Sequence, residues 1–201
     1  MYRTVNIQIS RDSELFEWCS HNARCANNLY NAALFRERQM MSSAGKSLHQ
    51  LTDNELEVMS EVEFAKLDMS KPREVPKSGF MGYVFLDAVM KYSGNPDYNA
   101  VGSPKHCAQN TLKNVVQDIT SYFEALKDWK KHPGKYKGKP AMPRYRHKNG
   151  ISAFKSSNIE CRIRKAKRGN FYCLLPKTKL RVPLGKKIPG KLLEVHVTPV
   201  N

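Results

Sequence analysis

The chain has 201 residues, 40% of them apolar, and a formal net charge of +16. This apolar share suffices for one large or two small folded domains. No apolar run approaches the roughly 18 residues that cross a bilayer, and the start MYRTVNIQIS lacks the hydrophobic block of a signal peptide. We therefore expect a cytoplasmic protein that does not enter a membrane.

The charge is unevenly distributed along the chain. Residues 1–100 hold 11 Lys and Arg against 13 Asp and Glu, whereas residues 101–201 hold 23 against 5. A cationic half of this kind predicts a polyanionic partner, nucleic acid before a membrane surface. The alternative is a basic segment that only aids solubility or resembles a ribosomal tail.

The five cysteines include no C-x-x-C pair. An odd number of unpaired cysteines favours free thiols in a reducing compartment, and a zinc site built from them alone is not expected.

The first predicted elements are a strand and three helices. Val5, Ile7 and Ile9 alternate with polar residues, which is typical of a half-buried strand, and a helix follows to about residue 41. The capping box Thr52–Glu55 predicts a second helix that ends near Leu67. A third helix is predicted over residues 80–92, where Gly94-Asn95-Pro96 would end it.

The clearest periodicity predicts a fourth helix, which begins near Ser103-Pro104 and ends at residues 132–134. Its apolar residues follow one another at spacings of three and four, as on one face of a helix. This stripe favours packing inside a helical bundle over a short coiled-coil dimer seam. Its members are Ala108, Leu112, Val115, Ile119, Tyr122, Leu126 and Trp129.

After residue 150 the hydrophobic period changes to two. Residues 159–163 and 171–175 alternate around a turn at residues 165–170, and a last strand is predicted over residues 193–197. Because an isolated strand is not stable, the strand at residues 5–9 is expected to pair with these C-terminal strands. The predicted fold is therefore α+β: a small antiparallel β-barrel of the oligonucleotide-binding kind, interrupted by an inserted helical bundle.

Three stretches together resemble the N-terminal half of the TnpB proteins of insertion sequences, which are related to miniature type V CRISPR nucleases. These stretches are NLYNAAL at residues 28–34, QNTLKN at residues 109–114 followed by Tyr122-Phe123, and PAMPRYR at residues 140–146. The resemblance lies in their order and spacing, and it covers nearly the whole chain.

The resemblance implies a wedge domain formed by residues 1–10 and 145–201, and a recognition lobe formed by residues 11–144. It also implies that cleavage belongs to a RuvC nuclease domain with bound Mg²⁺, followed by a zinc ribbon. Neither domain is found in these 201 residues, so we expect a part of a longer polypeptide with no catalytic site and no cofactor of its own. A natural form without a nuclease is the alternative.

The basic stretch at residues 136–148 and the basic strands predict an RNA-binding surface. Lys and Arg neutralise phosphates, and tyrosines stack on unpaired bases. The alternative is a solvated hinge whose tyrosines pack on the barrel. The candidate RNA-binding residues are Tyr136, Lys137, Lys139, Arg144, Tyr145, Arg146, Lys148, Arg162, Arg164 and Lys167.

The resemblance further implies a surface that reads a short DNA motif flanking the target. Glutamine pairs with adenine in the major groove, and lysine reaches guanine or a phosphate. An ordinary solvated helix face is the alternative. The candidate residues are Lys105, His106, Gln109, Lys155 and Ser156.

These features predict the guide-RNA and target-DNA binding part of a transposon-associated, RNA-guided DNA endonuclease in a prokaryotic or mobile-element setting. Its partners would be a guide RNA, double-stranded target DNA and the nuclease part of the parent protein. Two alternatives remain open: a nuclease-lacking RNA-guided repressor, and a structural RNA-binding protein with no DNA target.

Overall fold

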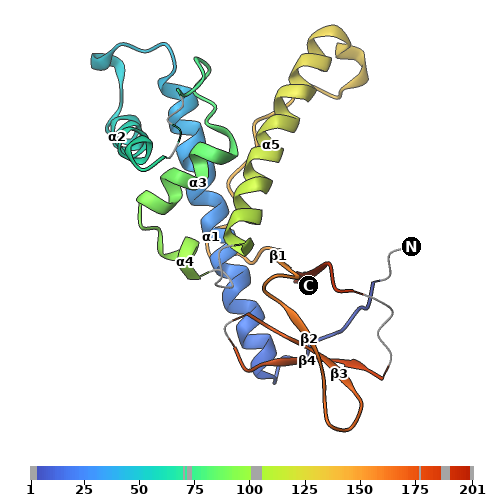
Figure 1. Cartoon of the computed structure of the whole chain (residues 1–201). Coiled ribbons are helices and arrows are strands. Elements are labelled where there is room, and N and C mark those ends of the chain that lie inside the picture. Colours follow the sequence, from blue (N-terminus) through green and yellow to red (C-terminus); the bar gives the residue numbers. More distant parts are fainter. Residues whose placement is uncertain are drawn as a thin grey trace. The chain divides into compact units, whose positions relative to one another are not determined.

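The chain folds into two compact units of mixed α+β structure. The computed structural model describes residues 4–69, 71, 74–100, 106–176, 178–186 and 191–199. The β unit comprises Met1–Asn28, Pro96–Asn110 and Asn149–Asn201, and the helical unit comprises Leu29–Asn95 and Thr111–Lys148. Two long helices, α1 (Glu14–Ser43) and α5 (His106–Lys131), contribute residues to both units (Figure 1). The units therefore divide the chain inside these helices, whereas the predicted lobe spans residues 11–144.

The helical unit contains α2 (Asp53–Leu67), α3 (Gly82–Tyr92) and the short 3-10 turns η1 (Leu48–Gln50) and η2 (Pro133–Lys135), besides its parts of α1 and α5. The predicted stripe on α5 is fully buried at Leu112, Val115 and Ile119, and becomes half-buried beyond them. Its burial within one chain fits bundle packing rather than a dimer seam.

The start of α2 follows the predicted capping box. The Thr52 hydroxyl accepts a hydrogen bond from the Glu55 N–H at 3.3 Å, and the Glu55 carboxylate accepts one from the Thr52 N–H at 2.9 Å. Lys46 donates to the same carboxylate at 2.5 Å. The helix ends at Leu67, so this prediction is confirmed at both ends.

The start of α3 is capped by a residue far away in sequence. Glu37 on α1 is fully buried, and its two carboxylate oxygens accept the backbone N–H groups of Met81 at 3.0 Å and Gly82 at 3.1 Å. Helix α3 has no side-chain cap of its own at Met81. Glu37 therefore satisfies amide groups that would otherwise be buried without an acceptor. Burial raises the pKa of Glu37 to about 8.

Replacement of Glu37 by glutamine is expected to flatten the pH dependence of stability. A carboxyl whose pKa is raised in the folded protein binds its proton more tightly there than in the unfolded chain. The stabilisation of the folded protein that comes from this tighter proton binding is therefore full below about pH 4.5, and it is lost as pH rises towards about 8. Chemical denaturation between pH 5 and pH 9 should show wild-type stability falling more steeply than that of Glu37→Gln. Glu57→Gln, a change at an exposed residue of α2, should follow the wild type; equal slopes for all three proteins would contradict the prediction.

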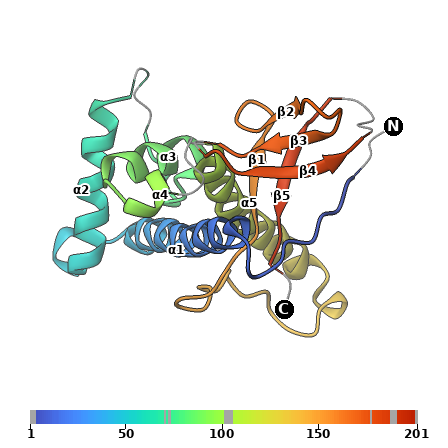
Figure 2. The same cartoon turned by 90° about the horizontal axis from the view of Figure 1, so that it is seen from below.

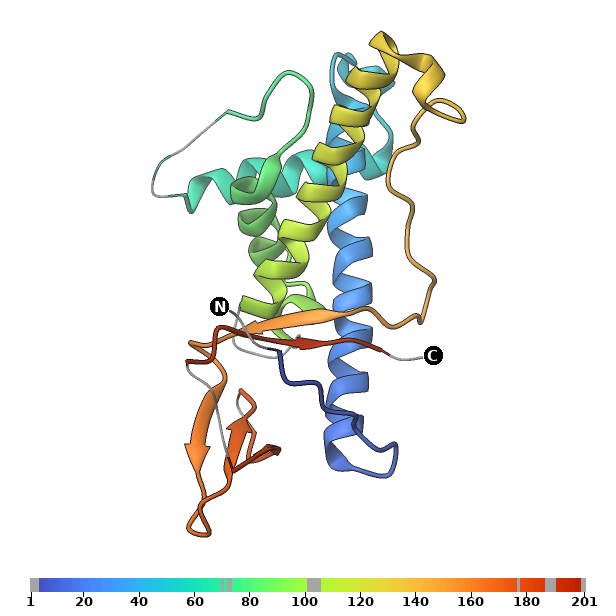
Figure 3. The same cartoon turned by 90° about the vertical axis from the view of Figure 1, so that its right-hand side faces the viewer.

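The β unit holds two antiparallel sheets. Strand β1 (Phe154–Ser157) pairs with β5 (Glu194–Val197), so that Phe154 lies opposite Val197 (Figure 3). Strands β2 (Arg162–Lys165), β3 (Phe171–Leu174) and β4 (Arg181–Gly185) form a second sheet in that order (Figure 2). The short helix α4 (Pro96–Ala100) and the first half of α1 belong to the same unit.

The core of the β unit forms between the inner face of the second sheet and the start of α1. Cys161, Cys173 and Leu175 are buried there, and seven partly buried side chains pack against them. The rings of Trp18 and Phe154 pack edge to face, with 5.8 Å between their centroids. The packing residues are Leu15, Trp18, Leu180, Val182, Leu184, Leu192 and Val195.

The predicted first strand is wrong. Residues 4–10 form no strand, and Val5 and Ile7 are 57% and 37% exposed. Alternation makes a strand possible, but a strand also needs a partner strand, and among the described strands β1 pairs with β5 rather than with residues 4–10. Among the described residues neither sheet closes into a barrel. The hairpin around residues 165–170 and the last strand are confirmed, and neither β1 nor β4 is among the predicted strands.

Candidate nucleic-acid interface

The outer face of the β2–β3–β4 sheet is basic. Backbone register places Arg162 beside Leu174, and Leu174 beside Arg181, in one row across the sheet. The next row places Arg164 beside Tyr172. Because side chains alternate along a strand, these residues share the face opposite the core. All three arginines are exposed.

This face has the composition of a nucleic-acid platform. The Arg181 guanidinium lies 4.7 Å from the centroid of the half-buried Tyr172 ring. Residues 161–193 include eleven Lys and Arg and no Asp or Glu. In the β unit Glu160 is buried and Glu194 pairs with His196 at 2.9 Å, so the carboxylates that flank this segment are already engaged. The positive potential of the face therefore has little local compensation.

The tip of the β2–β3 hairpin extends the cationic surface. Gly169 adopts φ +85°, its N–H donates to the Ala166 carbonyl at 2.9 Å, and the Ala166 N–H donates to the Asn170 carbonyl at 2.7 Å. A positive φ at this position requires glycine in a tight hairpin turn with a bulge. Three cationic side chains of this hairpin are exposed: Lys167, which is a candidate RNA-binding residue, and its neighbours Lys165 and Arg168.

The basic loop at residues 136–148 belongs to the helical unit, and α1 anchors it. The Asn31 side chain bonds both backbone groups of Arg146, accepting from its N–H at 2.8 Å and donating to its carbonyl at 3.0 Å. The Arg146 guanidinium lies 3.6 Å from the centroid of the Tyr30 ring, and burial lowers its pKa. Tyr30 in turn donates to Asp118 at 2.6 Å. Arg146 is thus part of the packing that holds the loop.

Three further contacts fix the loop. Arg38 on α1 donates to the Pro143 carbonyl, and its guanidinium lies 4.6 Å from the centroid of the Tyr145 ring. The Tyr136 hydroxyl donates to Asp128 at 2.8 Å, and this bond raises the pKa of Tyr136. The predicted cations that remain exposed are Lys137, Lys139, Arg144 and Lys148.

Arg144 and Arg146 are therefore expected to respond differently to replacement by glutamine. Arg144→Gln should leave the melting temperature within about 1 °C and weaken RNA binding severalfold, because an exposed charge costs little to remove. Arg146→Gln should cost about 1–2 kcal/mol of stability, since it removes the stacked guanidinium from Tyr30. Thermal unfolding and RNA anisotropy titrations measure both effects. Equal melting temperatures for the two variants would contradict this assignment.

Two of the residues predicted to read DNA, His106 and Ser156, lie beside a buried carboxylate. Glu160 accepts the backbone N–H of His106 at 3.0 Å and the hydroxyl of Ser156 at 2.9 Å. The His106 Nδ1 lies 2.7 Å from the Ser157 hydroxyl. Because α5 begins at His106, Glu160 caps this helix from the turn between β1 and β2.

The other predicted DNA-reading residues are differently placed. Ser156 is 3% exposed, Gln109 is half-buried and Lys155 is exposed on β1. Lys105 lies outside the described residues. The structure thus brings His106 and Ser156 together around Glu160, where their hydrogen bonds stabilise the fold. That these five residues read DNA stays a prediction.

Sequence reasoning did not identify Tyr172 and Arg181. The signal was present in the alternation of residues 181–184 and in the absence of acids over residues 161–193. However, the contact between these two side chains depends on the β3–β4 register, which sequence spacing does not give.

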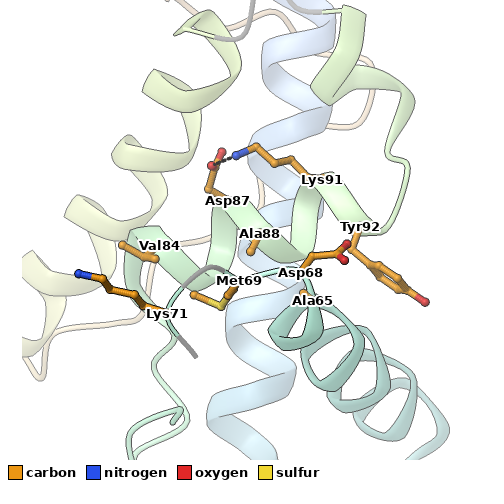
Figure 4. Close-up of a pocket in the computed structure, with 9 residues that line it drawn as sticks. All are labelled: Ala65, Asp68, Met69, Lys71, Val84, Asp87, Ala88, Lys91 and Tyr92. Carbon is orange, nitrogen blue, oxygen red and sulfur yellow. Dashed lines mark hydrogen bonds and ion pairs between the residues drawn. The ribbon is translucent and has the colours of Figure 1, made fainter. Parts of the chain in front are cut away.

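A pocket between α2 and α3 in the helical unit is differently charged (Figure 4). It has a volume of about 490 Å³, and its polar lining includes Asp68, Lys71 and an Asp87–Lys91 ion pair. Since acids and bases are balanced there, this pocket does not favour phosphate. Among the described residues no group of three or more His, Cys, Asp or Glu is placed to hold a metal ion, and no helix is long and apolar enough to cross a membrane.

Comparison with protein-family models, curated proteins and solved structures finds no match to this chain. The functional argument therefore depends on the chemistry of the surfaces described above.

Proposed function

We propose that this chain binds RNA, and that the outer face of the β2–β3–β4 sheet is its principal contact surface. The observation that carries the proposal is the group of three exposed arginines, Arg162, Arg164 and Arg181, around Tyr172 on a segment that contains no carboxylate. The guanidinium group of arginine can donate two parallel hydrogen bonds to phosphate oxygens, and an aromatic ring on a sheet offers a stacking surface for unpaired bases. The exposed lysines of the loop at residues 136–148 add a second phosphate-binding surface.

The proposal extends to the kind of protein. The ordered motifs similar to TnpB proteins support a guide-RNA and target-DNA binding part of an RNA-guided endonuclease, whose catalytic Mg²⁺ would belong to a separate nuclease domain. In that case the antiparallel strands of the β unit are the wedge, and its closure into a barrel is part of the proposal. Base pairing would read the target, and protein would read only a flanking motif.

One observation favours a second candidate, a structural RNA-binding protein without a DNA target. The Ser156 hydroxyl donates to Glu160 at 2.9 Å, and the His106 Nδ1 lies 2.7 Å from the Ser157 hydroxyl, so the side chains of two of the five residues predicted to read DNA have partners within the fold.

Anisotropy titrations of the purified chain with a fluorescein-labelled RNA hairpin carrying a single-stranded tail test the proposal. Contact with about five phosphates predicts that log K falls with log salt at a slope near −4. Absence of binding at 50 mM salt would contradict RNA binding. After RNA is bound, tight binding of duplex DNA drawn from a library of flanking motifs would favour the guided function over the structural one.

A further inference from the structure

A second feature of the basic sheet is a pocket along the free edge of β2. It has a volume of about 460 Å³ and is lined by residues of β2, by Phe171 at the start of β3, and by Asn158, Lys191 and Leu192. The Asn158 N–H donates to the Leu193 carbonyl at 3.1 Å, which holds the segment at residues 191–193 beside Asn158. The pocket walls therefore come from three stretches tied by backbone pairing.

The strand edge adds backbone groups to this pocket. Ala166 and Asn170 form a hydrogen-bonded pair at the end of the hairpin. Because such pairs alternate in an antiparallel ladder, Arg164 and Arg162 also bond towards β3, and the N–H and C=O of Ile163 point away from it. Ile163 lines the pocket, and among the described residues no backbone hydrogen bond outside the β2–β3 ladder engages its N–H or C=O, so both groups face a ligand at this edge.

The charge of the pocket is positive. Arg162, Arg164 and Lys191 line it and are exposed, and no acidic side chain is among the lining residues. The aromatic ring of Phe171 is half-buried, with the Lys165 ammonium 5.7 Å from its centroid. The side-chain amide of Asn158 supplies both a donor and an acceptor.

We propose that this pocket holds a single unpaired nucleotide of RNA, an inference that rests on the proposed function and names a subsite within it. The base would lie against Phe171 and bond to Asn158 and the Ile163 backbone, while the arginines and Lys191 hold the flanking phosphates. One strand edge thus combines an aromatic ring, an amide, free peptide groups and three cations. An acidic peptide would use the cations alone, and duplex nucleic acid presents its bases already paired.

The test compares octauridylate with an abasic octamer of the same ribose-phosphate backbone, because uridines stack weakly on one another. Anisotropy competition should show the wild type binding octauridylate about tenfold more tightly than the abasic octamer. Phe171→Leu and Asn158→Ala should each bring this ratio towards one without changing the salt slope, because neither removes a charge. Asn170→Ala, an uncharged change at an exposed hairpin residue outside the pocket, should keep the wild-type ratio.

The outcomes separate this subsite from the proposed function. Equal affinity of the wild type for both octamers, with a steep salt slope, would overturn the nucleotide subsite and leave RNA binding in place. Failure to bind either octamer or the RNA hairpin would overturn both. A loss of the affinity ratio in Asn170→Ala would also overturn the subsite. A third probe, an octamer of deoxyuridine, tests the sugar: wild-type affinity for it equal to that for octauridylate would contradict the assignment to RNA and overturn the subsite.

Discussion

The triple variant Arg162→Gln, Arg164→Gln, Arg181→Gln is expected to bind RNA on the order of a hundredfold more weakly than the wild type at 0.1 M salt. Each arginine lost from a phosphate contact removes about 0.7 from the salt slope on a single strand, so the slope should become shallower by about 2. Because the three side chains are exposed on the outer face of the sheet, stability should change by less than about 1 kcal/mol. Anisotropy titrations at several salt concentrations, with thermal unfolding beside them, measure both effects.

A matched variant controls for total charge. Replacing Arg11, Arg24 and Lys77 with glutamine removes the same charge from exposed positions outside the strands. This variant should keep most of the wild-type affinity and slope. If the two triple variants lose affinity equally, RNA is held by overall charge alone and the sheet face has no special role.

Gly79→Ala is expected to destabilise the helical unit by about 3 kcal/mol or more. Gly79 adopts φ +74°, and a Cβ there would lie 2.0 Å from the carbonyl oxygen and 2.6 Å from the carbonyl carbon of Met40 on α1. Backbone atoms cannot move aside as a flexible side chain can, so the clash adds to the cost of a left-handed conformation. The melting temperature should fall by about 6–12 °C.

Gly82→Ala is the control for conformation without a clash. Gly82 adopts a similar φ of +70°, yet among the described residues no atom beyond its chain neighbours lies within 4 Å of the place that an alanine methyl group would take. Only the backbone strain remains, so the cost should be near 1 kcal/mol. A loss as large for Gly82→Ala as for Gly79→Ala would show that the close approach to Met40 does not limit stability.

Helices α1, α2, α3 and α5 and the net charge follow from local patterns in the sequence, whereas the short helix α4 was not predicted. The apolar residues of the stripe on α5 follow one another at three or four positions, and the capping box of α2 joins residues three positions apart. Both patterns can therefore be read within the sequence of a single helix. The turn at residues 165–170 was likewise a local signal, with a glycine where a positive φ is needed. The cationic second half is a property of composition, which folding does not alter.

Which of these residues remain available to a partner depends on contacts between segments that are distant in the sequence. Arg146 and Arg144 look equivalent in sequence, but Arg146 stacks on Tyr30, more than a hundred positions away, and Arg144 stays exposed. Tyr172 meets Arg181 only because of the strand register. Residues 4–10 alternate like a strand, yet β1 takes β5 as its partner. Exposure and pairing depend on contacts between distant segments, and the local periodicity of a sequence does not encode them.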